Sequence, residues 1–209
     1  MTFAQFIVIP IFIAFQAFTM MLIARYVPGN PLAIGGAGLM TWVAFQAWAV
    51  YFFAGFAPWN DKENGPCPRM GGKTMLGYLG GIICSIAIFE LNGVFASLNS
   101  ADGGHLWGLY LAVFLVVIAV IACEKAPFFN FVPAWFIGAG VFFALMTFAG
   151  GSRPEAMSDW GWYGTLALVE MVACFVGQVY GWITVTFRGA YESKFTSEDT
   201  TPITDAEVA

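Results

Sequence analysis

Six long apolar runs, separated by short polar breaks, constrain this sequence more than any other feature. We place the runs at about 3–24, 32–56, 74–97, 105–122, 131–149 and 160–187. A helix that crosses the hydrocarbon core of a bilayer needs about 20 mostly apolar residues. Only 10% of the residues are charged, whereas soluble domains are about a quarter charged. The pattern therefore predicts an all-α polytopic membrane protein, with six transmembrane helices in a domain over residues 1–190.

The two ends of the chain differ in character. The first run has no basic segment before it and no small-residue cleavage site near Arg25, so we interpret it as a retained helix and not as a signal peptide. Pro10 lies inside this run, and we expect it to kink the helix. Residues 191–209 are acidic and have little to bury, which predicts a disordered cytoplasmic tail.

Positive charges between the runs predict the orientation of the helices. Cytoplasmic loops of membrane proteins carry an excess of Lys and Arg. If the amino terminus is cytoplasmic, the inner side holds Lys62, Arg69, Lys73, Lys125, Arg188 and Lys194, and the outer side holds Arg25 and Arg153. We therefore expect both termini to be cytoplasmic.

Two of the runs resemble each other and predict an inverted repeat. Residues 31–49 and 133–151 share a leading proline, a glycine-rich start and a later alanine, at an offset of about 102 residues. If these runs correspond, each half of the chain has three helices, so the second half is inserted upside down relative to the first. The prediction is a 3+3 inverted repeat. The alternative is six unrelated helices that share small residues.

Small residues on these helices predict close packing between them, because a bare surface lets another backbone approach. We expect such contacts at eight glycines: Gly36, Gly38, Gly77, Gly81, Gly138, Gly140, Gly177 and Gly181. The same kind of surface could join copies of the chain into a homo-oligomer, or join the chain to a partner in a larger membrane complex. The lipid bilayer is the other expected partner.

Several of these motifs resemble a bacterial inner-membrane family of unknown function, the YcdZ-like family. The motifs are FVP at 131–133, FIGA at 136–139, FAG at 148–150, WVAFQAWA at 42–49 and FFAG at 52–55. The resemblance covers roughly residues 30–150, and this chain differs in its loop at 57–72 and in its acidic tail. It implies a location in the bacterial inner membrane. It implies no activity, and no functional residue can be transferred from it.

Two acidic side chains, Glu90 and Glu170, lie within the apolar runs, where an ionisable group is costly. Glu170 shares a helix face with small residues, which are Ala173, Cys174, Gly177 and Gly181. That face is too bare for lipid, so we expect Glu170 to point into the bundle, while the direction of Glu90 stays open. Both could line a path for a solute. Alternatively, they are neutral carboxyl groups that only join helices.

Uncharged side chains complete the candidate lining of such a path. We select Gln46 and Gln178, together with Trp42 and Phe142, which with Trp48 and Phe143 would form its narrow part. The alternative for the glutamines is again hydrogen bonding between helices.

The residues that enzymes and metal sites need do not form a pattern. There is one histidine, the four cysteines include no CxxC pair, and no nucleotide-binding or hydrolase motif is present. No basic patch favours nucleic acid. We therefore expect no enzymatic activity, no metal and no cofactor.

Two functions fit these observations. The first is a channel or facilitator for a small neutral or weakly polar solute, because inverted repeats often enclose a substrate path and no ring of charges suggests a pore for ions. The alternative is a non-catalytic accessory or structural subunit of a larger membrane complex.

Overall fold

The computed structural model describes residues 2–26, 37–56, 68–101, 103–127, 129–148 and 159–195. Within these residues the chain is helical apart from turns and one isolated bridge between Asn99 and Leu106. This confirms the all-α class. The helices are α1 (Phe3–Phe6), α2 (Val8–Tyr26), α3 (Ala37–Phe56), α4 (Pro68–Val94), η1 (Ala96–Leu98), α5 (Trp107–Ala122), η2 (Cys123–Lys125), α6 (Val132–Phe148) and α7 (Trp160–Glu192).

The first predicted helix is divided into α1 and α2 at Ile7. Pro10 has no N–H to bond to the carbonyl group of Phe6, so the backbone ladder is interrupted one turn before the proline. The predicted disturbance is therefore present, at the residues that precede Pro10.

Two helix boundaries differ from the prediction. α4 begins at Pro68 and not near residue 74, because a proline is tolerated in a first turn, where its missing N–H has no partner. α7 continues to Glu192, into the segment predicted as tail. Its start is fixed by Asp159, whose side chain accepts a hydrogen bond from the backbone N–H of Trp162 at 3.0 Å. Residues 196–209 of the tail lie outside the described residues.

Several helices have the length and composition of membrane spans. Among the described residues, three stretches are long and apolar enough to cross a membrane: Phe3–Tyr26, Gly71–Val94 and Trp160–Glu192. α5 and α6 are also apolar but shorter. The chain is thus a helical protein with the character of a membrane protein.

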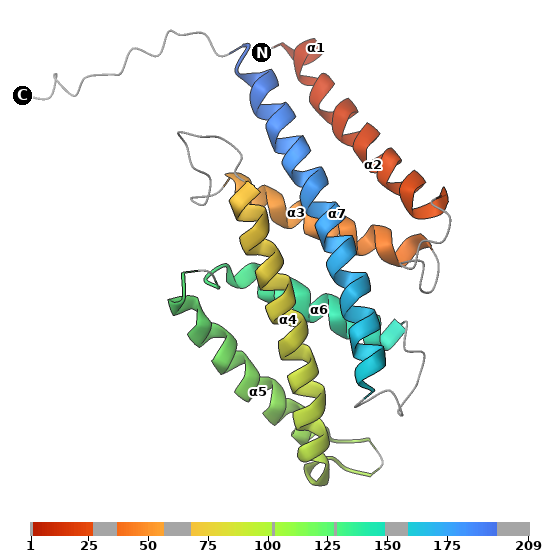
Figure 1. Ribbon diagram of the computed structural model, residues 1–209, viewed down its shortest axis with the longest axis vertical. Helices are drawn as coiled ribbons and strands as arrows, with labels where there is room; N and C mark the ends of the chain where they lie inside the picture. The colour runs from red at the N-terminus through yellow and green to blue at the C-terminus, as the bar shows by residue number, and fades with distance from the viewer. Residues whose placement is uncertain are drawn as a thin grey trace, which may run out of the picture.

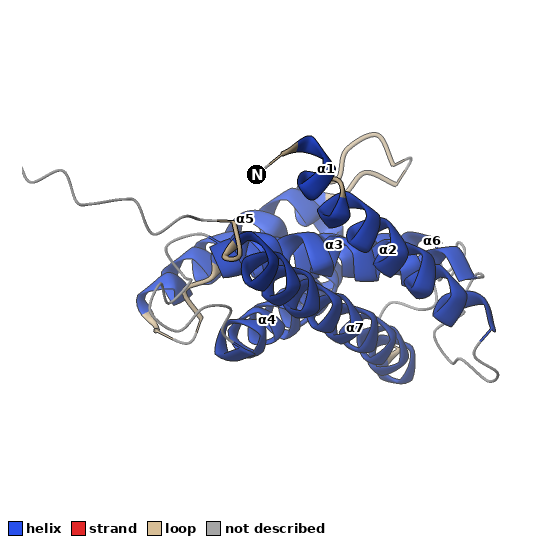
Figure 2. Cartoon of the chain, turned by 90° about the horizontal axis from the view of Figure 1, so that it is seen from above, coloured by secondary structure: helices blue, strands red, loops and turns tan. Residues whose placement is uncertain are grey.

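The two halves of the chain pack mainly against each other. α7 packs against α3 and α4 packs against α6, and the helices of each pair cross in Figure 1, while α5 contacts α4 and α2 contacts α3. α4 and α7 also contact each other and run in opposite directions (Figure 1). Seen from above, α4 and α7 lie along the lower edge of the bundle, and α2, α3, α5 and α6 lie above them in the view (Figure 2).

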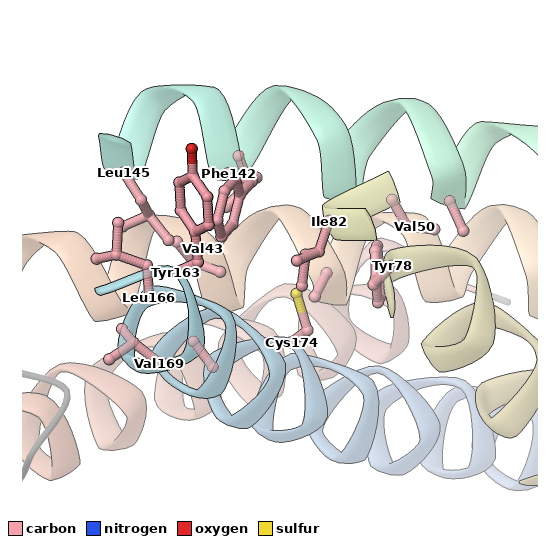
Figure 3. Close-up of a cluster of buried hydrophobic side chains, with 14 of the residues drawn as sticks. Val43, Val50, Tyr78, Ile82, Phe142, Leu145, Tyr163, Leu166, Val169 and Cys174 are labelled. Carbon is pink, nitrogen blue, oxygen red and sulfur yellow. The ribbon is translucent and has the colours of Figure 1, made fainter. Parts of the chain in front are cut away.

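The main core lies where α3, α4, α6 and α7 meet. Figure 3 shows its side chains gathered between these helices, with Phe142 and Leu145 of α6 near Tyr163 and Leu166 of α7. A second cluster joins α4, α5 and α6 around Trp135, and a third joins α2 and α3 around Trp48.

Glycines allow these helices to approach one another. A Cβ atom added at Gly81 would collide with backbone atoms of Trp135 and Ala139, and one added at Gly177 would collide with backbone atoms of Ala44 and Trp48. An added Cβ at Gly138 would likewise collide with the backbone of Tyr78, while one at Gly77 would collide with Cβ of Ala134 and one at Gly181 with the side chain of Tyr51. Five of the eight selected glycines therefore lie at close helix contacts.

The other three selected glycines do not add to these contacts. At Gly140, no heavy atom of the described residues lies within 4 Å of an added Cβ, so this position is open and the expected contact is missing. Gly140 is on α6 two residues after Gly138, and this places it on a different side of the helix. Gly36 and the surroundings of Gly38 lie outside the described residues.

We predict opposite effects for alanine at two glycines of α4. Gly81→Ala forces α4 and α6 apart and should cost about 1–3 kcal/mol of stability. Gly93→Ala is the matched control, because an added Cβ there meets no described heavy atom within 4 Å. It should stabilise the helix by about 0.5–1 kcal/mol. Thermal unfolding of the purified protein in detergent measures both changes. Equal midpoints for the two variants would contradict the close contact.

Candidate functional site

Three polar side chains are buried along the contact between α4 and α7. They are Tyr78, Glu170 and Gln178, each less than 5% exposed. Tyr78 is on α4 and the other two are on α7. Buried polar groups normally have hydrogen-bond partners. An atom of these side chains that has no partner is therefore one that a bound molecule could contact.

Gln178 joins three helices through its amide nitrogen. Nε2 donates to the carbonyl oxygen of Ala47 on α3 at 2.7 Å and lies 3.1 Å from the hydroxyl of Tyr78 on α4. Oε1 is buried and has no hydrogen-bond partner among the described residues. The side chain therefore has a helix-joining role and also presents an available acceptor.

Glu170 lies wholly inside the bundle, on the face predicted from its small neighbours. Its side chain has 0% exposure, and neither carboxyl oxygen has a hydrogen-bond partner within the described part of the chain. The thiol of Cys174 and the phenol of Tyr78 are its titratable neighbours. Arg188, further along α7, instead binds Glu192 at 2.8 Å. An unpaired carboxylate in such surroundings would be very costly, so the neutral acid is the form that fits this position.

Glu90 faces α7. Tyr163 of α7 is a buried residue with 1% exposure, and its hydroxyl donates a hydrogen bond to Glu90 Oε1 at 3.1 Å. The sequence left the direction of Glu90 open, and this hydrogen bond shows that its side chain points towards α7. The contact ties the end of α4 to the start of α7, which favours the helix-joining interpretation of Glu90.

The aromatic residues selected for a narrow passage lie in different parts of the bundle. Trp42 is 42% exposed and lies on the surface of α3, away from the main core of the described residues. Phe142 is fully buried in the main core, with its ring centroid 6.2 Å from that of Tyr163. Trp48 packs in the cluster between α2 and α3, and Phe143 packs beside α5. The sequence showed that these rings are apolar but not which side of the helix each occupies.

Gln46 has a position unlike that of Gln178. It is half-buried on α3, and the structure gives it no hydrogen bond within the described residues. It therefore lies at the border between bundle and surroundings, and it does not belong to the buried set on α4 and α7.

Sequence reasoning missed a polar network that centres on Thr184. Trp48 Nε1 donates to Thr184 Oγ1 at 3.0 Å, and Thr184 Oγ1 donates to Gln16 Oε1 at 2.6 Å. Gln16 Nε2 also donates to the carbonyl oxygen of Tyr180 at 3.3 Å. These bonds join α2, α3 and α7. Thr184 lies on the face of α7 that carries Gly177 and Gly181, and this periodicity was the available signal.

A cavity of about 440 Å³ opens between α3, α4 and α7 and reaches Gln178. A smaller cavity of about 230 Å³ lies between α4, α5 and α6. Its walls are apolar and include the side chain of Trp135. No three His, Cys, Asp or Glu side chains within the described residues are grouped as a metal ion would need. The end of the 440 Å³ cavity that reaches Gln178 is therefore the candidate site.

We predict that Glu170→Met keeps or raises stability. Methionine removes two unsatisfied oxygens and fills a similar volume, which should gain about 1 kcal/mol or more. Thermal unfolding in detergent measures this, with Glu90→Met as the contrasting variant, because it removes the acceptor of Tyr163 and should destabilise. If the midpoint of thermal unfolding falls as much for Glu170→Met as for Glu90→Met, the prediction is wrong and Glu170 stabilises the fold.

The comparison with known proteins extends the sequence findings. The chain matches no curated protein and no solved structure. A family model described as "Protein of unknown function (DUF1097)" matches residues 6–189, which is nearly the whole chain. The chain belongs to this uncharacterised family.

Proposed function

We propose that this chain is a YcdZ-like protein of the bacterial inner membrane, in which six spans form two inverted triplets, α2–α4 and α5–α7, with both termini in the cytoplasm. Between the triplets the protein provides a route for a small neutral or weakly polar solute. The unsatisfied oxygens of Glu170 and Gln178 where the two halves meet are the observation that carries this function.

Helix lengths support six spans. α5 and α6 have 16 and 17 residues, and at 1.5 Å per residue they are roughly 25 Å long. The hydrocarbon core is about 30 Å thick, and a local thinning of the bilayer accommodates shorter helices at modest cost. α3, with 20 residues, has the length of the full core.

The arrangement of helices supports the repeat. A half-turn about the line of sight of Figure 1 carries α2 towards α5, α3 towards α6 and α4 towards α7. The same exchange converts the α3–α7 contact into the α6–α4 contact, and these are the two most extensive contacts between helices. Tyr78 and Gln178, which are 100 residues apart, hydrogen bond to each other, as equivalent residues beside a twofold axis can do.

The register of the repeat differs from the one that the glycine echo predicts. Gly77 and Gly81 meet residues 134–139 of α6, and Gly177 and Gly181 meet residues 44–51 of α3. If these contacts are equivalent, α3 and α6 correspond at an offset of about 90 residues, roughly three helical turns away from the offset of the sequence match. The repeat that we propose is therefore a repeat of helix order and of helix contacts, and it does not follow the alignment of the glycine match.

The buried oxygens suggest what the route carries. In a bilayer, no water compensates a polar group that the protein leaves unsatisfied. A solute or water molecule that donates a hydrogen bond would satisfy Gln178 Oε1. Another, about two helical turns away on α7, would hydrogen bond to the neutral carboxyl group of Glu170. The surroundings of Glu170 and Gln178 do not present the ring of charges or the oriented carbonyl groups that ion pores use. A neutral solute that donates a hydrogen bond therefore fits best.

Flux through liposomes tests the function. We expect purified protein to raise the entry rate of urea-sized neutral solutes above that of empty liposomes. Glu170→Leu, which removes the acceptor from the interior, should lower the rate at least tenfold. Glu90→Gln is the control and should retain it, because the amide oxygen can still accept from Tyr163. Entry no faster than in empty liposomes across a panel of solutes would reject the proposal.

An accessory subunit remains the second candidate, and open glycines favour it. Added Cβ atoms at Gly140 and Gly164 meet no described heavy atom within 4 Å, so these positions could receive a helix of another protein. Purification in mild detergent separates the two functions. A homo-oligomer favours the route, and a defined foreign partner favours the subunit.

A further inference from the structure

The cavity between α3, α4 and α7 has mainly apolar walls, and its polar lining side chains are Gln178 and Tyr51. Its lining residues are uncharged, and they are Tyr51, Gly71, Gly72, Met75, Phe175, Gln178, Val179 and Trp182. At about 440 Å³ it has the size of a small-molecule site. Because Phe175 and Trp182 are 58% and 40% exposed, the cavity is reached from the outer surface of the bundle.

The orientation of the Gln178 amide follows from its neighbours. The atom 2.7 Å from the carbonyl oxygen of Ala47 must be the nitrogen, since a carbonyl oxygen can only accept. Oε1 therefore faces the opposite way, towards Gly71, where it would lie 3.8 Å from an added Cβ. Gly71 lines the cavity, so the buried acceptor that lacks a partner lies directly behind this part of the cavity wall.

This geometry selects the chemistry of an occupant. A lipid acyl chain would fit the apolar walls but would leave Oε1 unsatisfied, because it has no hydrogen to donate. A cation would lack a counter-charge, since no lining residue is acidic. The aromatic rings of Tyr51, Phe175 and Trp182 favour a flat body. A neutral, flat molecule with one N–H or O–H group satisfies all three conditions.

We propose that this cavity binds a small uncharged aromatic or similarly flat molecule, which enters from the membrane side and donates one hydrogen bond to Gln178 Oε1. The inference rests on the proposed function, because it names the class of solute that the route admits.

Indole and 1-methylindole are the probes, because they share a flat apolar body and only indole has an N–H donor. Equilibrium dialysis of the purified protein in detergent, against matched empty micelles, measures their binding. We expect indole to bind saturably and at least about tenfold more tightly than 1-methylindole, as one hydrogen bond to a buried acceptor allows. Equal affinities would overturn the proposal.

Two variants locate the binding. Gln178→Met removes the acceptor and should reduce indole to the affinity of 1-methylindole. Gly71→Ala adds a methyl group 3.5 Å from the ring of Tyr51 and 3.8 Å from Gln178 Oε1, which are ordinary contacts, so the fold should tolerate it. This variant narrows the polar end and should weaken indole binding severalfold.

The matched controls are Gln46→Met and Gly93→Ala, neither of which lines the cavity, and both should bind indole as the wild type does. Unchanged binding by Gly71→Ala would place the site elsewhere and overturn the proposal. Discriminating indole binding without solute flux would sustain this site and reject the transport route. Solute flux without discrimination between indole and 1-methylindole would support the transport route and reject this binding site.

Discussion

Close packing at glycines between helices from opposite halves of the chain is the interaction on which the rest of the structure depends. α4 reaches α6 through Gly77 and Gly81, and α7 reaches α3 through Gly177 and Gly181. In lipid, apolar side chains gain little by leaving their surroundings, so close packing supplies much of the attraction between helices. Each half is thereby held by the other, and the main core of the described residues is built from both.

The same close packing determines where polar groups can lie. Once α3, α4 and α7 meet at Gly177, the side chain of Gln178 is enclosed beside Ala47 and Tyr78. Glu170, two turns earlier on α7, is enclosed with it. Polar groups buried in a membrane helix are costly and usually functional. The oxygens that remain unsatisfied are therefore the most informative atoms of the described structure.

Much of the fold could be predicted from the sequence, because apolar runs and glycine spacing act locally. The six helical stretches, the burial of Glu170 and five of the glycine contacts follow from periodicity alone. The exposure of Trp42, the Tyr163–Glu90 bond and the Thr184 network do not, since each depends on which neighbour lies opposite a given face. The pairing of helices across the two halves also does not follow from the sequence, because the glycine match says nothing about which turns of α3 and α6 meet α7 and α4.

The placement of the helix ends relative to the bilayer tests the central claim of two inverted triplets most directly. Single cysteines at Ala101, Lys125 and Ser193, in a chain without its native cysteines, can be labelled with a membrane-impermeant maleimide in intact cells. Two inverted triplets predict that Ala101→Cys reacts from outside, whereas Lys125→Cys and Ser193→Cys react only after the membrane is permeabilised. Labelling of Ala101→Cys and Lys125→Cys from the same side would show that α5 does not cross, and would contradict the claim.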